Sequence, residues 1–146
     1  MDAKNLVEEL GTTLGIRLQF SDQGVCTVLF DQDEISFEQH DNLLYMIADL
    51  GASLDREDVY TRLMEANYLG AETGLATIGI DKTKQNFVLH RVFEGDLDYK
   101  TFEEATVLFV KACRYWKQWL AVASTNEPLP APEPPLVFNP SLLLRV

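Results

Sequence analysis

Residues 63–81, LMEANYLGAETGLATIGID, carry the pattern that decides how the chain is interpreted. The stretch begins with helical spacing, crosses a loop that holds Gly70 and Gly74, and ends in alternating apolar residues typical of a strand. Gly70 is a plausible helix stop, because glycine adopts the left-handed conformation that ends many helices. The sequence therefore predicts a helix, a short loop and a strand in direct succession.

The residues on either side extend both elements. Residues 55–68 form the helix, with Asp55 as its candidate cap and one apolar stripe made of Val59, Leu63 and Ala66. A second strand is predicted at residues 86–93, NFVLHRVF, after a polar loop that follows residues 74–81. Two adjacent strands joined by a short polar loop favour an antiparallel pair.

The first half of the chain adds a helix and several strands. Residues 3–14 have helical spacing, with Asp2 as a candidate cap and Gly15 as a candidate end. Three or four short antiparallel strands are predicted next, from residues 16–20, 25–30, 34–38 and 43–51. The last of these runs is mostly apolar, which fits a central strand or a helix.

A long closing helix begins near Asp98 or Thr101 and runs to about Val122. Thr101 and Glu104 have the spacing of a capping box, and the aromatic residues of this helix are expected to pack against the sheet. The element order α-βββ-α-ββ-α predicts an α+β sandwich, in which helices pack on one twisted antiparallel sheet. We expect one domain over residues 1–123 and a proline-rich tether with an apolar end over residues 124–146.

Charge is distributed unevenly along the chain. The net charge is −11, and residues 1–75 alone hold 4 basic and 15 acidic residues. An acidic field of this kind repels nucleic acid and anionic membranes, so neither is expected as a partner. It would attract a basic partner, although protection against aggregation explains it equally simply. No segment has the length or hydropathy of a membrane span, and no secretory signal is evident, so we expect a cytoplasmic protein.

Residues that could support catalysis are few. The two histidines, His40 and His90, have no cysteine or carboxylate at metal-ligand spacing, and Cys26 and Cys113 form no redox or zinc motif. No nucleophile elbow or phosphate-binding glycine loop is present. We therefore expect no enzyme, metal or cofactor. A fold-assembled pocket that joined a histidine to a cysteine would argue for the enzyme alternative.

Together, LGIRLQF at residues 14–20, LLYMIADLG at 43–51, LMEANYLGAETGLATIGID at 63–81 and the closing helix resemble the class I type III secretion chaperones, the Tir chaperone family. The resemblance covers roughly residues 3–122. It implies a small cytoplasmic bacterial homodimer that binds the N-terminal region of an effector and holds it extended for export. It also implies that the protein catalyses nothing, and that the secretion ATPase is a further partner.

The family pattern also suggests which residues meet these partners. In the family, the second helix and the following strand form the dimer interface, which here implies Val59, Tyr60, Leu63, Met64, Asn67, Leu75, Thr77 and Ile78. The wide apolar surface of residues 55–68 fits self-association or burial within one subunit equally well. Grooves made by the first helix and early strands receive the effector, which implies Leu6, Leu10, Leu14, Leu18, Phe20, Val28 and Phe30, several of them as core residues.

The tail departs from the family pattern, because the chain continues past the last helix as residues 124–146. One hypothesis is that LVFNPSLLLRV, residues 136–146, occupies a client groove and guards it until an effector arrives. The alternative is a loose terminus with an apolar end. A second function class also stays open, namely a non-catalytic adaptor that binds folded partners.

Overall fold

The computed structural model describes residues 1–125 and 128–129 of the 146-residue chain. The predicted element order is confirmed, with a short 3-10 helix added after the second helix. The elements are α1 (Ala3–Leu14), β1 (Val25–Phe30), β2 (Asp33–His40), β3 (Leu43–Ala52), α2 (Glu57–Asn67), η1 (Tyr68–Gly70), β4 (Thr77–Asp81), β5 (Asn86–Glu94) and α3 (Tyr99–Ala123).

All five strands form one antiparallel sheet in the order β1-β2-β3-β5-β4. Two-residue turns join the first three strands, so Phe30 pairs with Asp33 and His40 pairs with Leu43. The polar loop at residues 82–85 joins β4 to β5. The α+β prediction is therefore confirmed, and residues 43–51 belong to a central strand and not to a helix.

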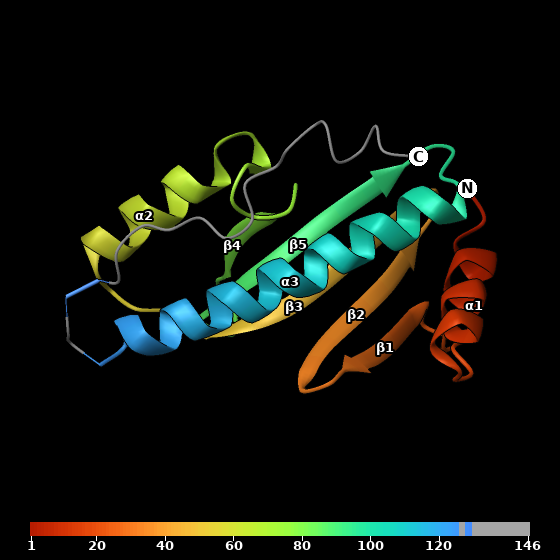
Figure 1. Cartoon of the computed structure of the whole chain (residues 1–146), viewed down its shortest axis with the longest axis horizontal. Helices are drawn as coiled ribbons and strands as arrows, with labels where there is room; N and C mark the ends of the chain where they lie inside the picture. The colour runs from red at the N-terminus through yellow and green to blue at the C-terminus, as the bar shows by residue number, and fades with distance from the viewer. Residues whose placement is uncertain (126–127, 130–146) are drawn as a thin grey trace.

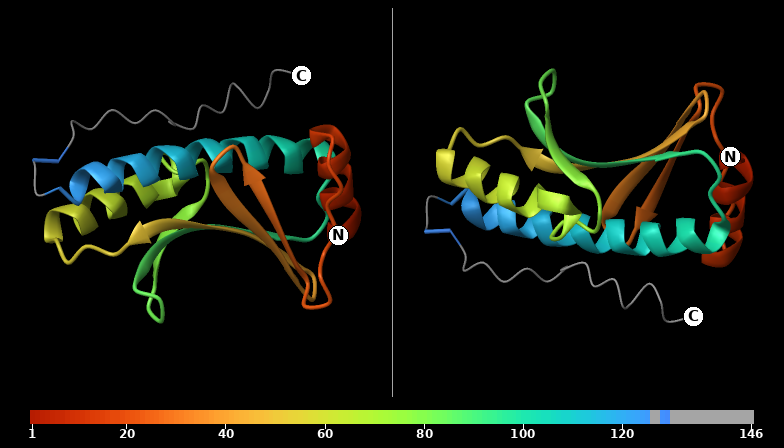
Figure 2. Two further views of the ribbon diagram at one scale, coloured as in Figure 1. Left: turned by 90° about the horizontal axis from the view of Figure 1, so that it is seen from below. Right: turned by 90° about the horizontal axis from the view of Figure 1, so that it is seen from above.

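The helices cover one face of the sheet (Figures 1 and 2). α3 runs along that face. α1 stands at the N-terminal end of α3, and α2 lies beside the C-terminal half of α3. In the described part of the chain, no helix covers the opposite face. None of the described helices is long and apolar enough to span a bilayer.

The core lies between α3 and the covered face of the sheet. Alternate strand residues point into it, among them Ile35, Phe37, Leu44, Met46 and Leu89. From α3 the largest contribution is Trp116, which is fully buried and donates from Nε1 to the Glu72 carbonyl at 2.8 Å. The expectation that the aromatic residues of the last helix serve the core is thus confirmed for Trp116 and Trp119.

The strand prediction for residues 16–20 is wrong. The chain turns back at Gly15, whose φ of 73° is left-handed, and the Ile16 N–H donates to the Gly11 carbonyl at 2.9 Å. A Cβ on Gly11 would lie 2.7 Å from the Ile16 oxygen. Glycine therefore allows the extended segment to lie against the end of α1, where it joins no sheet.

Two helix caps also differ from the prediction. α3 begins after Asp98, one of the two predicted starts, whose carboxylate accepts from the Thr101 N–H at 2.9 Å, so the capping box predicted at Thr101 is wrong. At α2 the capping position is Arg56 and not Asp55, and no helix N–H donates to the Arg56 side chain, which instead bonds to the Asp58 carboxylate. At α1 the prediction holds, since the Asp2 carboxylate accepts from Asn5 N–H.

The predicted tether begins where the closing helix ends. α3 stops at Ala123, one residue beyond the expected end. The hypothesis of a guarding segment at residues 136–146, and its alternative of a loose terminus, both concern residues outside the described part of the chain. Leu129 is described, and it packs as a partly buried residue against the core.

Candidate functional site

The outer edge of β1 has backbone groups that pair with no other strand. The two-residue turn between Phe30 and Asp33 sets the pairing of β1 with β2, in which Cys26, Val28 and Phe30 exchange hydrogen bonds with β2. By alternation, Thr27 and Leu29 direct their N–H and C=O groups outward, and no partner is recorded for these groups in the described residues. Val25 is closed off, because Ser21 bonds to both of its outward groups.

Exposed apolar side chains lie at two separate places, one on this edge and one at the end of α1. Leu29 is 66% exposed, and Leu14 and Ile16 are 42% and 50% exposed at the end of α1. A hollow of about 530 Å³ lies between the outer face of α1 and residues 16–19. Exposed apolar residues beside an unpaired strand edge are the arrangement that binds an extended peptide.

The residues predicted to receive an effector divide into two groups. Leu6, Leu10, Leu18 and Val28 are core residues, each less than a tenth exposed. The accessible ones are Leu14, which is exposed, and Phe20 and Phe30, which are partly buried at the margin of the core. The predicted set did not include Ile16 or Leu29, which are both exposed. Leu29 alternates with the core residue Val28 along β1.

The residues predicted for a dimer interface divide in the same way. Val59, Leu63 and Ile78 are core residues of their own subunit. Met64 is 72% exposed and Thr77 is exposed, whereas Tyr60, Asn67 and Leu75 are half-buried. Tyr60 packs inward, with its ring edge against Phe87 at a centroid distance of 6.2 Å. Only part of the predicted set is therefore available to a partner in this structure.

The turn after α2 exposes further apolar residues that the sequence did not reveal. Tyr68 and Leu69 are 73% and 77% exposed, and Ile80 on β4 is 50% exposed. Leu69 has a φ of 55°, a left-handed conformation that is rare for a leucine and that directs its side chain to solvent. Met64, Tyr68, Leu69 and Ile80 together are called the α2 face below.

The edge of β4 is closed at one position by a side chain. Asn67 Nδ2 donates to the Ile78 carbonyl at 2.9 Å, and Asn67 Oδ1 accepts from the Ile78 N–H at 2.8 Å. The asparagine thus occupies the place that a neighbouring strand would take. This pairing also shows that the Ile78 peptide groups point away from β5.

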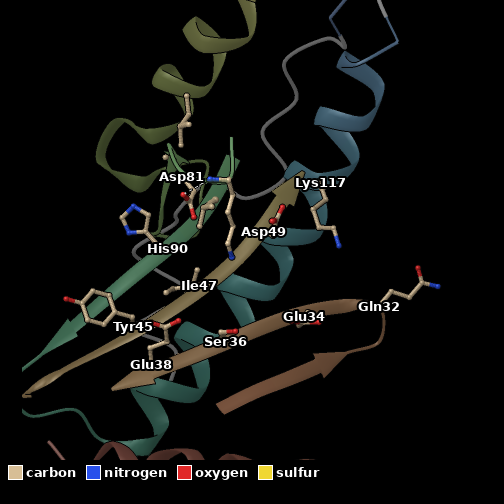
Figure 3. A pocket seen from close by; sticks show the side chains of 14 residues that line it. Gln32, Glu34, Ser36, Glu38, Tyr45, Ile47, Asp49, Asp81, His90 and Lys117 are labelled. Carbon is tan, nitrogen blue, oxygen red and sulfur yellow. Dashed lines mark hydrogen bonds between the residues drawn. The ribbon is translucent and has the colours of Figure 1, made fainter. Parts of the chain in front are cut away.

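The uncovered face of the sheet holds a polar hollow of about 780 Å³ (Figure 3), lined among others by Glu38, Tyr45, Ile47, Asp49 and His90. Its carboxylates have local roles. Asp49 accepts from the Gly51 N–H at 2.7 Å at a bulge in β3, and Asp81 accepts from the N–H groups of Thr83 and Lys84 in the β4–β5 turn.

The pairing that would favour an enzyme is absent from the described residues. His90 lines the uncovered face, whereas Cys26 and Cys113 are buried on the covered side. Burial raises the pKa of the Cys113 thiol to about 11 and also raises the pKa of Cys26, so both thiols stay protonated and unreactive near neutral pH. His, Cys, Asp and Glu form no group of three suited to a metal within the described ranges.

Comparison with known proteins identifies related chains. Residues 5–117 match the model of the Tir chaperone protein (CesT) family. A Chlamydia pneumoniae protein designated CPj0713/CpB0740 is 29% identical over 117 residues, which covers 77% of this chain and 88% of that protein.

Solved structures share the fold at low sequence identity. A chain of the ExsC–ExsE complex has a TM-score of 0.66 at 20% identity, covering 82% of this chain and 97% of that chain. A chain of the HopA1–SchA chaperone–effector complex has a TM-score of 0.66 at 15% identity, with 79% and 92% covered. The Yersinia pestis type III secretion chaperone SycH, solved with a fragment of YscM2, has a TM-score of 0.62 at 16% identity, with 77% and 98% covered.

Proposed function

The chain belongs to the Tir chaperone protein (CesT) family, and from that premise we propose that it is a type III secretion chaperone that binds the N-terminal region of an effector and keeps it extended and competent for export. The observation that carries the proposal is the open β1 edge at Thr27 and Leu29, where the Leu29 side chain is exposed. Such an edge accepts an unfolded segment but offers little to a folded surface.

The client segment lies along β1 as an added strand. Backbone bonds to Thr27 and Leu29 hold it without regard to its sequence, and alternate client side chains contact the exposed Leu29. Ordering an unfolded segment costs conformational entropy, which the buried apolar area has to offset. The affinity therefore depends on apolar residues spaced two apart in the client.

We infer that the chaperone works as a homodimer that associates through the α2 face. The exposed Met64, Tyr68 and Leu69 form an apolar patch on one side of the subunit, next to the half-blocked edge of β4. A two-fold dimer would cover this patch and present two β1 edges to one client. Doubling the contact raises the affinity for a long segment without any new kind of site.

Its cellular setting follows from the same proposal. The chaperone acts in the bacterial cytoplasm, where effectors are made, and passes its client to the secretion ATPase. Its action is binding alone, without a cofactor, because the energy for unfolding and export comes from the ATPase.

The proposal is tested by purifying the full chain from its native host and identifying co-purifying proteins by mass spectrometry. We expect an effector whose N-terminal region is protected from limited proteolysis in the complex yet stays unfolded. Leu29→Asp should weaken this binding by about tenfold or more, because it places a charge in the apolar contact. A partner that binds as a folded domain, with no effect of Leu29→Asp, would favour the adaptor alternative and overturn the proposal.

A further inference from the structure

β5 has an open edge that is separate from the edge of β1. β4 covers β5 only from Asn86 to His90, whereas β5 continues to Glu94 and pairs with β3 along that whole length (Figure 1). The Ile78 peptide groups point outward to Asn67, so the neighbouring Thr77 directs its peptide groups to His90 on β5. By alternation along β5, the peptide groups of Val92 and Glu94 point to the same side as those of His90, beyond the end of β4. Their N–H and C=O groups have no recorded partner in the described part of the chain.

The chain leaves the sheet before it can fill this edge. The turn before β4 bends toward α3, with Leu75 at a φ of 64° and Gly74 at 62°. The turn lies directly on the helix, since a Cβ on Gly74 would be 2.9 Å from the Leu108 carbonyl. The Val92 side chain itself lies on the uncovered face of the sheet and is 44% exposed.

A cation without a carboxylate partner lies at the same place. Arg91 is half-buried on the covered side of β5, and its guanidinium carbon is 4.8 Å from the centre of the Phe93 ring. Its one hydrogen bond in the described residues is long, 3.5 Å to the Gly74 carbonyl, and no salt bridge to it is found there. Burial lowers the pKa of Arg91, and no carboxylate opposes that effect.

The chemistry of this position selects for a negative charge. A half-buried guanidinium that is stacked on an aromatic ring is stabilised only in part, and its remaining donors favour a carboxylate. A strand added beside Val92 would direct every second side chain to the covered side, next to Arg91 and Phe93.

We propose that the open edge of β5 at Val92–Glu94 is a second binding edge, which takes an extended client segment that carries an Asp or Glu side chain paired with Arg91. This inference rests on the proposed function and adds a sequence preference to it. Beyond backbone bonds, the β1 edge contacts the client through apolar side chains, whereas the β5 edge requires an acidic client residue beside Arg91.

The test uses the full chain and three fluorescent peptides of about ten residues, in which Val and Thr alternate around a central Glu, Gln or Lys. With the unchanged chain, the Glu peptide should bind about tenfold more tightly than the Gln peptide, and more tightly still than the Lys peptide. Arg91→Gln should remove this preference, and Arg91→Glu should reverse it in favour of the Lys peptide. Lys111→Gln, which removes an exposed positive charge on α3, serves as the control and should leave the preference intact.

Hydrogen exchange locates the binding. The amides of Val92 and Glu94 should become protected when the Glu peptide is added. Equal affinity for the three peptides, or protection confined to Thr27 and Leu29, would overturn the inference while leaving the proposed chaperone function intact. If Arg91→Gln instead weakens self-association in sedimentation without any peptide, the occupant is a second copy of the chain, and the inference is also overturned. Failure of the effector pull-down with a retained peptide preference would count against the proposed function alone.

Discussion

Arg62 illustrates how one side chain links three elements. It lies on α2, pairs with both carboxylate oxygens of Glu72 in the loop before β4, and places its guanidinium 5.4 Å from the centre of the Trp116 ring on α3. The Arg62 and Glu72 side chains are only 10% and 18% exposed. Because both charges have left water, each depends on the other for stabilisation.

Glu72→Ala should therefore lower the free energy of unfolding by about 3 kcal/mol, since it leaves the Arg62 charge buried without its partner. Urea unfolding followed by circular dichroism measures this change. Glu65→Ala is the matched control, because Glu65 is 3.9 Å from Arg62 and 64% exposed, so its loss should cost less than about 0.5 kcal/mol. Equal costs for the two variants would contradict this account of Arg62.

At the scale of the element, β4 is an edge strand that is partly closed by Asn67. The two bonds between Asn67 and Ile78 fix how far β4 is available to another chain. Edge strands tend to recruit further strands, and a side chain that occupies the edge prevents such recruitment. In the described part of the chain, the sheet edges without such a side-chain partner are therefore β1 at Thr27 and Leu29, the end of β5, and β4 at Ile80.

Asn67→Ala should destabilise the protein by about 2 kcal/mol, because the Ile78 peptide groups lose both partners. It should also raise the exchange rate of the Ile78 amide and increase concentration-dependent association through β4. Asn67→Asp provides the control, since it keeps the acceptor for the Ile78 N–H and should have a smaller effect on that amide. An Ile78 amide that stays fully protected in Asn67→Ala would refute the role assigned to Asn67.

Local patterns predicted most of the elements but little of the site. α1, β1 and α3 follow from the spacing of apolar residues, which depends on burial along one element. The failure at residues 16–20 arose because alternation looks the same in a strand and in an extended segment held against a helix. The open edges were not predictable, since the exposure of Leu29 and Val92 depends on the order of strands and on where β4 ends.

At the scale of the whole molecule, the two proposed surfaces lie on different parts of the subunit. The β1 edge is next to α1, and the α2 face is beside the other end of α3 (Figure 2). Binding of a client and association of subunits should therefore respond to different substitutions.

Met64→Glu should weaken the proposed dimer by about a hundredfold or more, because it places a charge in the centre of the apolar α2 face. Analytical ultracentrifugation over a range of concentrations measures this shift. Leu29→Asp, which lies outside the α2 face, should leave the dimer unchanged while it impairs client binding. If Met64→Glu does not alter association, the α2 face is not the dimer interface.

Removing residues 130–146 tests the hypothesis that the chain's own C-terminal segment guards a client groove. If the segment competes with the client, the shortened chain should bind effector several-fold more tightly, because no internal competitor has to leave first. Fluorescence titration of the effector's N-terminal region against both forms measures the difference. An unchanged affinity would support the alternative of a loose terminus.

The tip of the β1–β2 hairpin is held to α3 by Asp33, whose carboxylate binds Arg114 Nε at 2.7 Å and Lys117 Nζ at 3.3 Å. The Arg114 guanidinium also donates to the Phe30 carbonyl at 3.2 Å. Under the proposed function, in which the secretion ATPase pulls on a client strand bound along β1, this anchoring determines which bonds break first. The docked strand detaches by peeling, one backbone bond at a time, whereas the anchored hairpin resists through several ionic bonds at once. A pulling force should therefore remove the bound client strand while the chaperone stays folded and able to bind another client.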